Sequence, residues 1–162
     1  MYNIVKENEL IHNKLNIFHN TVILNASIDK VFSFFSKAEN LELLTPAWLK
    51  FKILTPTPIL IKKGCLIDYR IKIFGIPVKW KTEITCWQPP HRFIDEQLKG
   101  PYKIWKHEHQ FIEHDNQTKM IDRVQYQVPG WFLSPIIHNF FVRKAIKNIF
   151  KFRSNVIEKI LG

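Results

Sequence analysis

Two histidines and an aspartate are the residues whose types and spacing could do chemistry. His107 and His109 lie two positions apart in KIWKHEHQFIEH, and Asp122 follows a short polar turn. Apolar and polar residues alternate through 103–128, which predicts two adjacent strands and places all three side chains on the aromatic face. A buried polar group without a hydrogen-bond partner costs about 1–3 kcal/mol. This face is therefore either a satisfied polar network or the wall of a wet pocket.

These residue types allow three interpretations. Two histidines with Asp122 or Asp95 could hold a divalent metal, if their donor atoms lie about 2.0–2.2 Å from one ion. A histidine bonded to a carboxylate could instead remove a proton from a carbonyl compound. In the third interpretation Asp122 and the histidines satisfy one another, and Tyr126 and Gln97 complete a network at the polar end of a pocket. We favour the third, and we expect neither a metal nor another cofactor.

Composition predicts one domain with a wide interior. The chain has 162 residues, of which 46% are hydrophobic and 14% aromatic. Domains cluster at roughly 100–150 residues, so we expect a single domain over 15–162 after a lead-in at 1–14. The two cysteines have neither metal-site nor disulfide spacing. No signal-peptide pattern and no run of about 20 apolar residues is present, so we expect a cytoplasmic protein.

The net charge of +10 favours an anionic partner. The chain has no RNP aromatic signature, zinc finger or Gly-rich phosphate loop, so we do not expect it to bind nucleic acid. Basic residues recur through the last fifth of the chain and could make transient contact with an anionic membrane, although a solvated helix face explains them as well. The oligomeric state stays open.

Hydrophobic periodicity predicts the order of the elements. A strand at 15–25 precedes a helix capped by Ser27 and a second short helix at 39–44. Strands follow at 50–55, 63–74, 78–87 and 92–99, and then come the two strands of 103–128. The facing of 92–99 is ambiguous. A helix over 134–161 closes the chain, with the apolar stripe Ile137, Phe141, Ala145, Ile149, Phe152 and Val156.

Three stretches carry a family resemblance: ASIDKVFSFFSKAENLELLTPAWLKFKI at 26–53, FIDEQLKGPYKIWKHEHQF at 93–111 and TKMIDRVQYQVP at 118–129. With the order of elements, they resemble the SRPBCC superfamily (START-like, Bet v 1-like), and within it the bacterial cyclase/dehydrase-type ligand-binding proteins. The resemblance covers 15–160. It implies an α+β helix-grip fold, in which a curved seven-stranded antiparallel sheet, two short helices and a long C-terminal helix enclose a cavity. That superfamily hosts many activities, so the fold does not fix the function.

The prediction is therefore binding, for transport or sequestration, of a hydrophobic or amphipathic molecule such as a lipid, quinone or polyketide-like compound. One alternative is a cyclase or dehydratase-type enzyme that uses His107, His109 and Asp122 for acid–base chemistry. Another is a protein-interaction module with a closed core. The residues expected to contact the ligand are Tyr69, Trp80, Asp95, Gln97, Trp105, His107, His109, Phe111, Asp122, Tyr126, Phe141 and Ala145.

Overall fold

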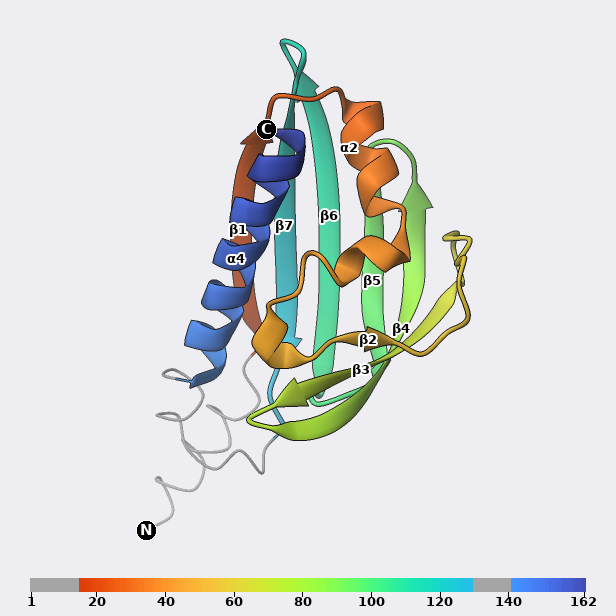
Figure 1. The fold of residues 1–162 in the computed structure, drawn as a ribbon, viewed down its shortest axis with the longest axis vertical. Helices are drawn as coiled ribbons and strands as arrows, with labels where there is room; N and C mark the ends of the chain where they lie inside the picture. The colour runs from red at the N-terminus through yellow and green to blue at the C-terminus, as the bar shows by residue number, and fades with distance from the viewer. Residues whose placement is uncertain (1–14, 130–140) are drawn as a thin grey trace.

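A seven-stranded antiparallel sheet forms the frame of the protein (Figure 1). The computed structural model describes residues 15–129 and 141–162. The strand order is β1-β7-β6-β5-β4-β3-β2, so only the pairing of β1 with β7 joins distant parts of the chain. The strands are β1 (Asn16–Leu24), β2 (Lys52–Ile53), β3 (Leu66–Ile73), β4 (Ile76–Gln88), β5 (Arg92–Lys99), β6 (Ile104–His114) and β7 (Gln117–Gln127).

Two tight hairpins set the register of the sheet. Phe74 and Gly75 link β3 to β4 with φ of 50° and 80°, and Asp115 and Asn116 link β6 to β7 with φ of 48° and 62°. Two-residue turns with positive φ at both positions match the right-handed twist of the strands. Gly, Asn and Asp adopt this conformation readily, whereas Phe74 is an unusual residue there. The predicted alternation in β6 and β7 is therefore preserved.

The helices lie together on one face of the sheet (Figure 1). Helix α2 (Ile28–Phe35) buries Val31 and Phe32 and packs against β6 and β7. Two 3-10 turns follow, η1 (Ala38–Leu41) and η2 (Ala47–Leu49). Ser27 occupies the N-cap position as predicted, but its side chain makes no capping hydrogen bond. The second helix and the second strand are both shorter than the sequence patterns predicted.

Helix α4 (Arg143–Leu161) crosses β1 with a different face from the one predicted. Residues 134–140 of the predicted helix lie outside the described residues. Phe141 and Ala145 of the predicted stripe are exposed, and the buried residues are shifted by about one position. Apolar residues cover a wide arc of this helix, so spacing alone did not select the packed face. That face carries Ile146, Phe150, Arg153, Ile157 and Leu161.

Two hydrophobic clusters form the core of the described part of the chain. The first packs Phe32 and Phe35 of α2 against Phe93 and Phe111 of the sheet. The second joins Tyr126 of β7 to Phe150 of α4. Phe111 was predicted to line a cavity, but it packs inside the first cluster, with ring centroids 5.5 Å from those of Phe32 and Phe35. The architecture is the predicted α+β fold, with a seven-stranded antiparallel sheet and a long C-terminal helix.

Candidate functional site

A cavity of about 220 Å³ lies between the sheet, the segment from α2 to η2, and α4. Most of its wall is apolar or aromatic. A few polar and charged groups stand among these side chains, as in small-molecule binding sites generally. The lining comprises Phe35, Lys37, Ala38, Asn40, Leu41, Leu44, Thr45, Leu49, Phe51, Ile61, Ile67, Tyr69, Ile71, Ile73, Trp80, Thr82, Ile84, Phe93, Asp95, Tyr102, Trp105, His107, His109, Ala145, Ile146, Ile149, Phe150 and Arg153.

Strand β5 was ambiguous in the sequence, and the structure settles its facing. Phe93 and Asp95 line the cavity. Gln97 lies outside the lining: its amide nitrogen donates to the backbone oxygen of Tyr102 (2.6 Å), and its amide oxygen accepts from the Tyr102 backbone nitrogen (3.3 Å). The predicted residues that do line the cavity are Tyr69, Trp80, Asp95, Trp105, His107, His109 and Ala145.

The other predicted residues lie away from the cavity wall. Phe111 and Tyr126 belong to the two core clusters, because period-two alternation identifies the face of a strand but not the position along it. Phe141 is 55% exposed and meets Phe74 edge-on at 6.3 Å. Asp122 is buried among the histidines and is absent from the lining. These four side chains therefore do not line this cavity, and their contact with a ligand stays a prediction.

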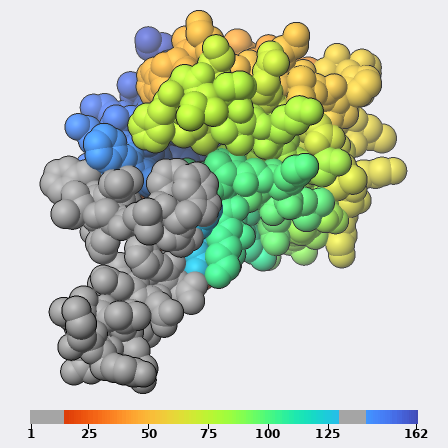
Figure 2. All heavy atoms as spheres, turned by 90° about the horizontal axis from the view of Figure 1, so that it is seen from below, coloured from red at the N-terminus to blue at the C-terminus, as the bar shows by residue number. Residues whose placement is uncertain are grey.

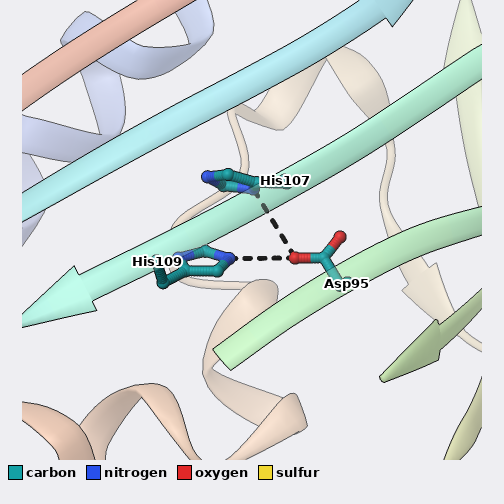
Figure 3. A group of neighbouring side chains, drawn as sticks. All are labelled: Asp95, His107 and His109. Atoms are coloured by element: carbon teal, nitrogen blue, oxygen red, sulfur yellow. Dashed lines mark hydrogen bonds and ion pairs between the residues drawn. The ribbon is translucent and has the colours of Figure 1, made fainter. Parts of the chain in front are cut away.

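Asp95, His107, His109 and Asp122 form a compact cluster across β5, β6 and β7; Figure 3 shows the first three. His107 Nε2 lies 2.8 Å from Asp122 Oδ1, and His109 Nε2 lies 2.9 Å from Asp95 Oδ2. The remaining contacts are longer, at 3.6 Å from His107 Nδ1 to Asp95 and 3.2 Å from His109 Nδ1 to Asp122. Each carboxylate thus faces both imidazole rings. Gln97 and Tyr126 were predicted to complete this network. The structure instead completes it with a second carboxylate, that of Asp95.

The electrostatics of the cluster keep both carboxylates ionised. Burial alone would raise the pKa of Asp122, but the hydrogen bond from His107, the close contact of His109 and the charge of Arg153 hold it well below its usual value. The pKa of Asp95 is lowered in the same way, against its burial, first by the bond from His109. Ionised carboxylates only accept hydrogen bonds, so the Nε2–H group of each histidine is the donor.

His107 is neutral at physiological pH. Burial and then the neighbouring His109 lower its pKa to about 4, although Asp122 and Asp95 act in the opposite direction. On β3, burial and then the charge of Asp95 raise the pKa of the Tyr69 hydroxyl, which lies 3.3 Å from the Thr82 hydroxyl. Trp80 Nε1 donates to the Thr82 hydroxyl at 3.1 Å. Tyr69 and Trp80 therefore present aromatic surface to the cavity while their polar atoms are already paired.

The cluster also has the residue types of a metal site. Donor atoms of Asp95, His107 and His109 lie within 4.8 Å of one another, whereas the sequence analysis had centred on Asp122. Asp122 contacts both rings and would act as the outer carboxylate that orients metal-bound histidines. A metal ion would have to displace the hydrogen bond between His109 and Asp95. Each histidine has a short bond to one carboxylate without an ion, whereas His109 Nδ1 has no hydrogen-bond partner among the described residues. The geometry therefore permits a metal but does not require one.

Among the lining residues that the sequence analysis missed, Arg153 is a buried cation. It was counted among the solvent-facing cations of the last helix, but it is 8% exposed and lines the cavity. Its guanidinium carbon lies 5.5 Å from the ring centroid of Phe35 and 5.7 Å from that of Phe150. The spacing of Arg153 could have indicated its burial. It lies three residues after Phe150 and four before Ile157, on the packed face of the helix.

Residues 24–152 match the family model described as polyketide cyclase / dehydrase and lipid transport. The chain belongs to this family. Among solved structures, an aromatase/cyclase from Streptomyces sp. R1128 (Zhui) is similar with a TM-score of 0.72 at 14% identity, over 90% of this chain and 93% of that one. The major latex-like protein 151 of Panax ginseng gives 0.66 at 11%, over 91% and 97%.

A START superfamily protein from Mycobacterium smegmatis is also similar to the present chain. The TM-score is 0.63 at 13% identity, over 89% of this chain and 98% of that one. At these identities the likenesses show the shared fold alone. A comparison with curated proteins found no match. Within 15–129 and 141–162, no helix has both the length and the apolar character needed to cross a membrane.

The depressed pKa of His107 predicts a loss of stability in mild acid. An unfolded histidine titrates near 6.5 and the folded one near 4, so protons bind the unfolded chain first. This contribution is fully present above about pH 6.5 and lost as the pH falls through about 4, a change of roughly 3 kcal/mol in the free energy of unfolding. Urea unfolding at a series of pH values would measure it.

His107→Gln should lack this part of the pH slope, because its amide can still donate to Asp122 but does not titrate. His19→Gln is the matched control, since His19 is exposed on β1, and it should keep the slope of the unmodified protein. An identical slope in His107→Gln and the unmodified protein would contradict the assignment.

Proposed function

We propose that the protein binds a hydrophobic or amphipathic small molecule in this cavity, for transport or sequestration. The observation that carries the proposal is a largely apolar cavity with a small group of polar side chains in its wall. Ile67, Ile71 and Ile84 contribute apolar wall from β3 and β4, and Asp95, the two histidines and Arg153 contribute polar groups. An apolar wall with a few convergent polar groups suits a ligand with a hydrocarbon body and a polar head.

The size of the cavity favours a compact ligand. Ligand pockets generally measure about 300–1,000 Å³, and this one is smaller, at about 220 Å³. A small ring system or a single acyl chain fits such a space better than a lipid with two long chains. The family description names polyketide cyclases and lipid transport together, and it is compatible with either ligand type.

Acid–base catalysis is the second candidate function. It is favoured by one observation: His107, His109 and Asp95 all line the cavity, where they could reach a bound carbonyl compound. Asp122, the carboxylate named in the sequence analysis, would act only by orienting the histidines. A general base works best with a pKa near the operating pH, and the pKa of His107 is about 4. We therefore place binding ahead of catalysis.

Filling the cavity should abolish binding. Ala145 lines the cavity but is exposed on α4, so Ala145→Trp adds bulk at the wall without removing a buried side chain. We expect its affinity for the neutral fluorophore 1-aminoanthracene to fall at least about tenfold, or about 1.4 kcal/mol. A fluorescence titration measures this. Asn148→Trp, also exposed on α4 and outside the lining, should bind normally, and equal affinities in the two variants would refute the proposal.

An anionic membrane, contacted transiently, is the partner that best suits a protein with a lipid-like ligand. The β3–β4 hairpin and the start of α4 lie side by side in the view from below (Figure 2). Phe74, Ile76 and Phe141 are exposed there, although apolar. Arg143, Lys144, Lys147 and Lys151 are exposed along α4. Apolar side chains beside a row of cations are typical of surfaces that bind anionic lipid.

This contact can be measured by co-sedimentation with vesicles. The protein should sediment with phosphatidylglycerol vesicles several-fold more than with phosphatidylcholine vesicles, since each cation near an anionic surface contributes about 1 kcal/mol. The pair Phe74→Asn and Phe141→Ser should reduce the anionic binding. The control pair, Leu98→Ser and Ile112→Ser, removes exposed apolar side chains from β5 and β6 and should not. Equal sedimentation with both lipids would rule the contact out.

A further inference from the structure

We propose that Arg153 is an anion-binding residue and that the ligand is an amphipathic acid. A carboxylate or similar oxyanion at the polar head would bind the guanidinium, while the hydrocarbon body contacts the apolar side chains of the cavity wall. The inference rests on the ligand-binding function proposed above, and it specifies the chemical class of the ligand.

Arg153 is a buried cation with unpaired hydrogen-bond donors. The side chain is 8% exposed, and its Nε atom has no hydrogen-bond partner among the described residues. The ion pairs found in 15–129 and 141–162 do not include it. A guanidinium stays charged and carries five N–H donors, so burial without a close anion is costly. An oxyanion in the cavity would supply the missing acceptor.

The carboxylates nearest to Arg153 form their short hydrogen bonds with the histidines. Asp95 accepts its short hydrogen bond from His109, and Asp122 accepts its own from His107. The charge of Arg153 lowers the pKa of both acids, but neither acid lies within ion-pair distance of it. Arg153 therefore stabilises the cluster at long range, and its N–H groups remain available to a ligand.

Two cations and two carboxylates lie in or next to the described cavity wall. Asp95, Arg153 and the exposed Lys37 line the cavity, and the ionised Asp122 contacts both His107 and His109 behind the wall. These charges balance, so it is the unpaired donors of Arg153, rather than the net charge of the wall, that favour an oxyanion. Contacts with the faces of Phe35 and Phe150 hold the guanidinium, so little side-chain entropy would be lost on binding.

The test compares two competitors that share a hydrocarbon body. Decanoate and 1-decanol would each displace 1-aminoanthracene from the unmodified protein at neutral pH. We expect decanoate to bind at least about tenfold more tightly than the alcohol, because hydrogen bonds between charged groups are the stronger ones. Arg153→Met, which keeps an unbranched apolar chain, should lose this preference, and Arg153→Lys should keep part of it.

Arg143→Met is the matched control, since Arg143 is exposed on the same helix and lies outside the lining. It should keep the full preference for the acid. A purely structural Arg153 would change stability or overall affinity without changing the ratio of acid to alcohol. An unmodified protein that binds both competitors equally would overturn the anion-binding role while leaving the ligand-binding function intact. If neither competitor displaces the probe, the ligand-binding function fails and this inference fails with it.

Discussion

The mutual hydrogen bonding of two aspartates and two histidines is the constraint on which the rest of the interior depends. Asp95, His107, His109 and Asp122 come from three adjacent strands, and each would be costly to bury alone. Their bonds form only in one register of β5, β6 and β7. A slip of one residue in any of these strands would turn that strand's members of the cluster to the other face of the sheet, so the cluster and the strand register specify each other.

The same cluster connects the two hydrophobic parts of the core. His109 stacks on Phe93 with centroids 4.0 Å apart, and His107 meets Phe150 of α4 edge-on at 5.3 Å. Arg153 lies one helical turn beyond Phe150 and supplies a positive charge facing the two carboxylates. The sheet and the C-terminal helix therefore both supply polar groups to the cavity wall, and a ligand would meet groups whose positions are already fixed.

Sequence periodicity predicted the strands and the inward facing of His107 and His109, because a strand has only two faces. It did not identify Asp95 as a hydrogen-bond partner of the histidines. That pairing depends on the register between β5 and β6, in which Asp95 lies opposite His107 but bonds to its diagonal neighbour His109. The packed face of α4 was also mispredicted, because its apolar residues cover a wide arc. The burial of Arg153 was not predicted, because a cation on an amphipathic helix is usually solvated. Here it lies on the packed face of α4.

The central claim is that the cavity holds a small amphipathic molecule, and native mass spectrometry tests it most directly. The unmodified protein and Ala145→Trp would be measured with the same excess of decanoate, under native and then denaturing conditions. We predict one added molecule per chain on the unmodified protein, lost on denaturation and absent from the variant. The bare mass for both proteins, or the same adduct on both, would contradict the claim.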